Sequence, residues 1–250
     1  MLKANLSDAY SKLNRANEHI SDVEALIANF LSSDFYKVRL EADQGTGRAK
    51  LIFDSLHQPD KRLNVLVGDA IGNLRSSLDY LFYALVFPLV GDPKMIGGFP
   101  FADDVNGFKG EIGKQGGIAQ CGAAIVDLLV DQVQPYQQGA GRLLWMINKL
   151  RNIDKHRLLV ASIDLAAVKL SFKIGGGSFN DCTFGAIAGQ SSILVDFPFS
   201  EFKLNSEIKP TYKVLLNEPP HVDRVEAVPL LRGASVQIET LLDALKILCV

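Results

Sequence analysis

The sequence has 250 residues, of which 48% are hydrophobic and 22% charged; this balance is typical of a globular protein and excludes wholesale disorder. The net charge of −2 excludes a general electrostatic attraction to nucleic acid, so any contact with phosphate requires a local cluster of basic residues. The three cysteines form no C-x-x-C pair, which argues against a disulfide framework or a zinc site and favours a reducing compartment.

The N-terminal residues 1–20 carry charges throughout and lack the apolar stretch of a signal peptide. The most apolar run, Tyr80 to Val90, is about half as long as a helix that crosses a bilayer. We therefore expect a cytoplasmic protein without a membrane-spanning segment.

Apolar residues recur at spacings of three and four along five stretches, which predicts amphipathic helices. The predicted helices cover about 2–31, 63–87, 118–133, 142–159 and 229–248. The second is expected to stop at Pro88, because proline lacks the amide hydrogen that a helix needs. Between the second and third, residues 91–117 are rich in Gly and Pro and read as a long loop with a helical turn near Phe108, anchored in the core by the Phe99-Pro100-Phe101 run.

Alternating polar and apolar residues predict strands in two regions of the chain. Residues 36–41 and 49–53 flank the turn Gln44-Gly45-Thr46-Gly47 and are predicted to form a β-hairpin. Further strands are expected at about 168–174, 180–184, 193–197 and 212–216.

These elements predict an α+β fold in one domain over residues 1–250. A helical bundle built from about 1–33, 62–160 and 228–250 would carry an antiparallel β-sheet contributed by about 35–54 and 168–216. A single domain with a β insertion is favoured because the last helix returns after the strands.

The predicted helix over residues 142–159 carries the most distinctive chemical pattern. At 100° per residue, five polar side chains fall within a sector of about 140°, opposite an apolar stripe that suits packing in a bundle. The polar set comprises Asn148, Arg151, Asn152, Lys155 and His156. Arg151 and Lys155, four residues apart, repel each other by a few tenths of a kcal/mol, and a bound anion would relieve that repulsion.

This group of side chains suits work on a phosphodiester. Arg151 offers a planar fork for two phosphate oxygens, and Lys155 adds a point charge. His156 can hold or release a proton near neutral pH, and Asn152 can orient the imidazole or bind a ribose hydroxyl. None of these roles requires a metal or another cofactor.

The run Arg151-Asn152-x-x-x-His156 resembles the R-x4–6-H motif of HEPN domains, in which a polar residue often follows the Arg. The resemblance implies a helical bundle, a homodimer that brings two motifs together, and metal-independent RNA cleavage by the ribose 2′-OH. Arg151 and His156 would then be catalytic, with Asn152 assisting. From their places on the polar face and beside it, Asn148, Lys155 and Arg75 are expected to bind substrate. The longer helix also resembles uncharacterised bacterial and phage-associated proteins, which tend to carry a second helix like Gly72 to Asp79.

Several readings of these residues stay open. The chain can be a HEPN-like endoribonuclease, a toxin or anti-phage effector; a non-catalytic module that binds nucleotide, RNA, a protein partner or an antitoxin; or a structural oligomerising protein. In the last case the polar face is a solvated surface, with the histidine cation at its end favourably placed near the C-terminus of the helix. Arg75 and Asp79, four residues apart, can likewise form a local ion pair, or lie beside the motif and orient His156.

Overall fold

In the computed structural model the chain has an α+β fold that divides into two compact units. The structure describes residues 4–57, 60–114, 117–157, 159, 161–185, 190–205 and 209–249. Unit 1 comprises residues 1–24, 62–160 and 216–250, and unit 2 comprises 25–61 and 161–215. That these units form a single domain stays a prediction.

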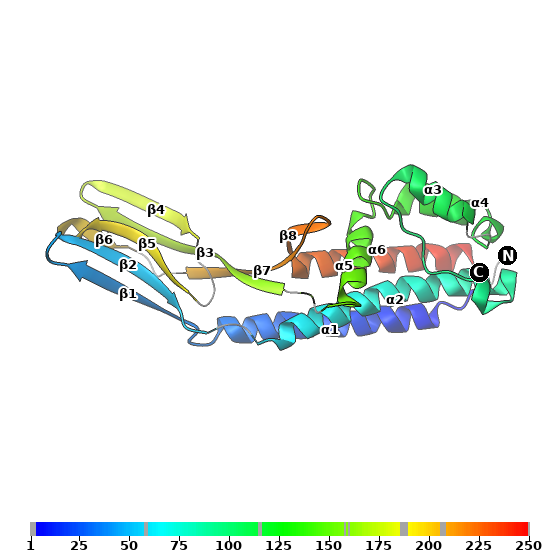
Figure 1. Cartoon of the computed structure of the whole chain (residues 1–250), viewed down its shortest axis with the longest axis horizontal. Coiled ribbons are helices and arrows are strands. Elements are labelled where there is room, and N and C mark those ends of the chain that lie inside the picture. The colour runs from blue at the N-terminus through cyan, green and yellow to red at the C-terminus, as the bar shows by residue number, and fades with distance from the viewer. Residues whose placement is uncertain are drawn as a thin grey trace. The chain divides into compact units, whose positions relative to one another are not determined.

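Unit 1 is a bundle of long helices, with α1 (Ser7–Leu31), α2 (Arg62–Val90), α5 (Arg142–Asp154) and α6 (Ala227–Leu248) as its main elements. Figure 1 shows α1 alongside α2, where the Ser77 hydroxyl donates to the Ala9 carbonyl at 2.8 Å. On α6, Arg232 binds Glu24 and Ser235 binds Asn17, both on α1. Fully buried side chains from the four helices form the core: Leu13, Ile20, Ile71, Leu74, Leu78, Ile147, Leu150, Leu231, Ile238 and Leu242.

The end predicted for α2 is wrong, because the helix continues through Pro88 to Val90. A proline in the last turn of a helix removes only one backbone hydrogen bond, and the helix has no further turns that it could disrupt. Gly91, with φ +70°, ends the helix instead, and its N–H donates to the Phe87 carbonyl at 2.9 Å. A glycine in the left-handed conformation just after the last turn is a common helix end.

The helix predicted over 118–133 is interrupted. Gly122 adopts φ 102°, a conformation that a helix cannot continue through, so a short 3₁₀ turn, η2 (Ala119–Cys121), precedes it. Beyond Gly122 come α4 (Ala123–Asp127) and a π-helical turn, η3 (Leu128–Val133).

The predicted loop 91–117 contains more helix than expected. It holds η1 (Pro93–Met95) and the ten-residue α3 (Val105–Lys114), which begins where the Asp104 side chain accepts from the Gly107 N–H. Phe99 is buried, so the prediction that the Phe99-Pro100-Phe101 run anchors this segment in the core is confirmed.

Unit 2 contains the predicted hairpin, formed by β1 (Tyr36–Asp43) and β2 (Arg48–Ser55). The two strands pair antiparallel from Tyr36 with Ser55 to Asp43 with Arg48. The four-residue connection includes Gly47 at φ +64°, where glycine adopts the left-handed backbone without strain.

The remaining strands of the chain are β3 (Ala161–Ile174), β4 (Gly177–Phe184), β5 (Ser191–Pro198), β6 (Phe202–Leu204), β7 (Lys209–Glu218) and β8 (Val222–Glu226), with a 3₁₀ turn, η4 (Phe199–Glu201), before β6. Of these, β8 and the last three residues of β7 belong to unit 1. The predicted strand regions are confirmed, although β3 begins earlier than expected and β6 and β8 were not predicted. The single sheet expected from the sequence is wrong. β5 joins the hairpin in the order β1-β2-β5, and a second sheet has the order β4-β3-β7-β8 with β6 beside β3.

Both sheets contribute to one hydrophobic core in unit 2. Its buried members are Phe35, Ala49, Leu51, Phe53, Val168, Leu170, Phe172, Leu194 and Phe197. Alternation along a strand shows which face of the strand is buried, but it does not show which other strands pair with it. The sequence pattern therefore does not distinguish two sheets from one.

Candidate functional site

Opposite the polar face predicted on α5, the helix carries buried apolar side chains, as the sequence predicts. Met146, Ile147 and Leu150 are buried, whereas Asn152 is exposed and Asn148 and Arg151 are half-buried. The amphipathic division is therefore confirmed over the second half of the helix, where the apolar side chains hold the polar residues at the surface of unit 1. At the start of the helix, Leu144 and Trp145 share the angular sector of the polar side chains but are buried.

The end predicted for this helix, about Leu159, is wrong. Regular helix stops at Asp154, where the His156 N–H donates to the Ile153 carbonyl at 3.0 Å and tightens the last turn. The Lys155 N–H still donates to the Arg151 carbonyl at 3.2 Å, so this final turn keeps Lys155 and His156 next to the preceding turn of α5.

We call Arg151, Asn152, Lys155 and His156 the basic end of α5. Within the described part of the chain these four side chains make no hydrogen bond or ion pair, and Asn152 does not bind His156 as its spacing allowed. Their polar groups are therefore available to a ligand.

The last turn of α5 lies against two glycines of α2. A β-carbon at Gly72 would lie 4.0 Å from Nε of Arg151, and one at Gly68 would lie 2.9 Å from Oδ1 of Asp154. Because neither glycine has a side chain, α5 can place Arg151 directly over the surface of α2. One turn further along α2, Arg75 reaches Asn148, so the structure brings Arg75, Asn148 and Arg151 into one row.

Arg75 is committed to contacts within the protein. Its guanidinium forms an ion pair with Asp79, donates to Asn148 Oδ1 at 3.0 Å and to the Phe99 carbonyl at 3.4 Å, and lies 4.8 Å from the centre of the Phe101 ring. The predicted local ion pair is confirmed, and Asp79 accepts from the Phe99 N–H at 2.9 Å. The cluster fixes the segment after residue 97 onto α2, and the role of Arg75 in binding substrate stays a prediction.

The charges at the basic end leave a small positive excess. Arg151 and Lys155 carry two positive charges, against one negative charge on neighbouring Asp154 and about half a negative charge at the C-terminus of a helix. So small an excess gives no strong field, and direct hydrogen bonds from these side chains would have to supply most of the affinity for an anion.

A second polar cluster in unit 1 was missed by the sequence analysis. Oδ1 of Asp103 accepts from Nε1 of Trp145 at 2.9 Å and from Nζ of Lys149 at 2.8 Å, and the His221 ring meets Trp145 edge-on at 5.9 Å between ring centres. The hydrogen bonds from Lys149 and then from Trp145 hold the pKa of Asp103 below its ordinary value. No spacing in the sequence relates Asp103 to α5, because the contact depends on how the long segment before α3 folds back.

Replacing Asp103 with asparagine should lower stability at neutral pH by about 0.5 kcal/mol, because Asn keeps an acceptor for Trp145 but loses the charge that attracts Lys149. Because the pKa of Asp103 is lower in the folded protein than its ordinary value of 3.8, the ionised carboxylate stabilises the fold above pH 3.8. This contribution is lost as the pH falls through the lower pKa of the folded protein. Denaturant melts of both proteins should therefore converge as the pH drops below 3.8. A difference that stays constant down to acidic pH would contradict the assignment.

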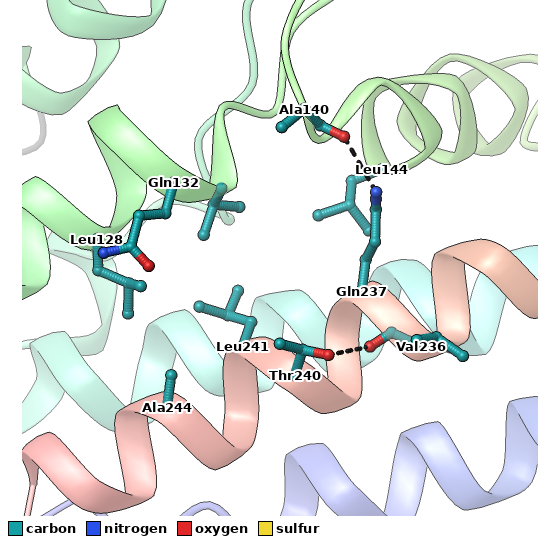
Figure 2. A pocket seen from close by; sticks show the side chains of 10 residues that line it. Leu128, Gln132, Ala140, Leu144, Val236, Gln237, Thr240, Leu241 and Ala244 are labelled. Carbon is teal, nitrogen blue, oxygen red and sulfur yellow. Dashed lines mark hydrogen bonds between the residues drawn. The ribbon is translucent and has the colours of Figure 1, made fainter.

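A pocket of about 210 Å³ lies elsewhere in unit 1, between α6, η3 and the start of α5 (Figure 2). Apolar side chains, including Leu128, Leu144 and Leu241, surround it, and Gln237 donates from α6 to the Ala140 carbonyl at 3.0 Å. None of the residues predicted to form the site lines this pocket. Its apolar wall offers no charged group for a phosphate.

Comparison of the chain with protein-family models, with curated proteins and with solved structures gives no match. Among the described residues, no helix is long and apolar enough to cross a membrane. Within the same residues, no three or more His, Cys, Asp or Glu side chains are grouped as metal ligands would be.

Proposed function

We propose that this chain is a HEPN-like, metal-independent endoribonuclease that binds the RNA backbone at the basic end of α5. The observation that carries the proposal is the set of polar side chains of Arg151, Asn152, Lys155 and His156, which lie beside one another at the surface and have no partner among the described residues. Other cations, such as Arg75 and Lys149, are bound to carboxylates of the protein itself. Polar groups with no internal partner are the ones that a phosphodiester can engage.

The chemistry assigns a role to each side chain. The ribose 2′-oxygen attacks the adjacent phosphorus, the bond from phosphorus to the 5′-oxygen breaks, and a 2′,3′-cyclic phosphate and a 5′-hydroxyl result. His156 transfers a proton, and Arg151 contacts the non-bridging oxygens, where negative charge grows. Asn152 positions the reacting groups, and Asn148 and Lys155 hold the neighbouring backbone. The predicted homodimer would supply a second His156 for the other proton.

A second function, RNA or nucleotide binding without cleavage, is favoured by one observation. His156 lies beyond the last residue of α5, and in the described part of the chain no side chain binds its imidazole. A general acid or base is usually held in place by a neighbouring group, so an unrestrained imidazole suits phosphate binding better than proton transfer. A protein partner or antitoxin would use the same surface.

The test is to incubate purified protein with mixed RNA in EDTA beside the Arg151→Ala/Lys155→Ala variant. Cleavage that leaves cyclic phosphates, and falls at least about tenfold in the variant, is expected, because charge-assisted contacts to the transition state are lost. The Lys173→Ala/Lys203→Ala protein is the matched control, since it loses two exposed cations on paired strands of unit 2. RNA that is retained but intact would establish the binding function, and RNA that is neither retained nor cut would refute both.

A further inference from the structure

The outward face of α2 carries a row of exposed aromatic side chains. Tyr80, Tyr83 and Phe87 are 44%, 40% and 36% exposed, although aromatic residues of this size are usually covered in a folded protein. Their spacing of three, four and seven residues places them on one side of the helix. A contiguous aromatic row, unlike a single exposed ring, marks a binding surface.

The rings are already arranged for stacking. Tyr83 and Phe87 lie 5.0 Å apart between centres with an interplanar angle of 12°, and Nζ of Lys12 lies 5.8 Å from the centre of the Tyr80 ring. Parallel rings beside a cation present flat, electron-rich surfaces next to positive charge, a combination that suits a base and its phosphate.

This aromatic row is continuous with the basic end of α5. At 100° per residue, Gly72, Ser76, Tyr80, Tyr83 and Phe87 share a sector of about 80° on α2. The guanidinium of Arg151 lies over Gly72, and at 1.5 Å per residue Tyr80 follows about 12 Å further along the helix. The exposed carboxylate of Asp69 lies on the other side of Gly72, away from the rings.

From this placement we infer that the α2 aromatic row, Tyr80, Tyr83 and Phe87, stacks with unpaired bases of a single-stranded RNA whose backbone is held at the basic end of α5. The inference rests on the proposed function and narrows its substrate. In an RNA duplex the base faces are covered by neighbouring pairs, so a stacking row selects single strands, loops or ends. Continuity with the basic end and the cation at Tyr80 favour RNA over a second copy of the chain as the occupant.

The experiment measures binding of a short unstructured 2′-O-methyl RNA, which 2′-OH attack cannot cut, by fluorescence anisotropy. Its duplex and an abasic oligomer with the same backbone are measured in parallel. Tyr83→Ala and Phe87→Ala should each weaken binding of the single strand about fivefold or more, as expected for the loss of one stacked base. Both should bind the abasic oligomer as wild type does, and Tyr83→Phe should keep full affinity. Lys155→Ala should weaken binding of all three oligomers.

Val236→Ala is the matched control, because Val236 is 60% exposed on α6, away from the row. If Tyr83→Ala and Phe87→Ala bind the single strand as wild type does, the inference is wrong while the proposed function stands. If either variant instead changes the oligomeric state measured by light scattering without RNA, the row is a contact between copies and the inference is also wrong. If wild type binds none of the three oligomers, the proposed function itself fails.

Discussion

The His156→Ala variant should cut RNA roughly 10² to 10⁴ times more slowly than wild type, the usual contribution of a general acid or base. Its affinity for RNA should fall far less, because in the proposed complex Arg151 and Lys155 would still contact the backbone. Single-turnover cleavage in EDTA, measured over a range of protein concentrations, separates the rate from the affinity.

His57→Ala provides a matched control, because His57 is also an exposed histidine but belongs to unit 2. It should cleave as wild type does. If His156→Ala keeps the wild-type rate, His156 has no part in catalysis, and if His57→Ala is equally slow, the effect does not arise at the basic end. A variant that loses affinity and rate together would instead indicate that His156 binds phosphate.

Replacing Arg157 with alanine is expected to lower the free energy of unfolding by about 3 kcal/mol, the usual cost of removing one partner from a buried ion pair. The Glu218 carboxylate is only 3% exposed and is bound through both oxygens by the Arg157 guanidinium, which is itself 57% exposed. Without Arg157 the carboxylate stays away from water with no counter-charge. Urea denaturation of both proteins at pH 7 measures the difference.

A matched control tests whether the burial of Glu218 sets the size of this loss. Arg15→Ala is the matched control, since it removes an ion pair to Glu18 in which both side chains are more than half exposed. That variant should lose less than about 1 kcal/mol. A similar small loss for Arg157→Ala would show that water reaches Glu218 readily.

The Arg157–Glu218 pair also bears on the site, because Arg157 directly follows its histidine. By binding Glu218 at the end of β7, Arg157 secures the turn that carries Lys155 and His156. Loss of this ion pair should therefore reduce RNA cleavage as well as stability. The conservative variant Glu218→Gln keeps an acceptor for Arg157 and should retain more activity than Arg157→Ala.

Local patterns in the sequence predicted the elements that depend on local forces. The buried stripe of α5 follows from the spacing of Met146, Ile147 and Leu150, and the hairpin follows from alternation around the turn at Gly47. The exposure of Asn152 follows from the same spacing, because a helix that buries one side must expose the other. The Arg75–Asp79 ion pair was also predicted from the sequence, since its two residues lie one helical turn apart.

Elements that end or meet through distant contacts were not predicted correctly. Helical periodicity continued past Asp154, but the chain tightens there and leaves the helix, and this placed His156 beyond the end of α5. Two further features do carry a local signal in the sequence. Gly122 is a glycine that can interrupt a helix, and Asp104 is a residue type that commonly starts one.

The sequence by itself therefore determined an α+β chain with an amphipathic α5 and a cluster of basic side chains on its outer side. Only the tertiary structure decided that the strands form two sheets around a shared core and that Asp103 binds Trp145 and Lys149. It also decided that Arg75 is committed to Asp79 and Asn148, whereas the Arg151 side chain lies over Gly72 and binds none of the described residues. The physical reason is that periodicity records which side of an element is buried, while the choice of partner depends on contacts between residues far apart in the chain.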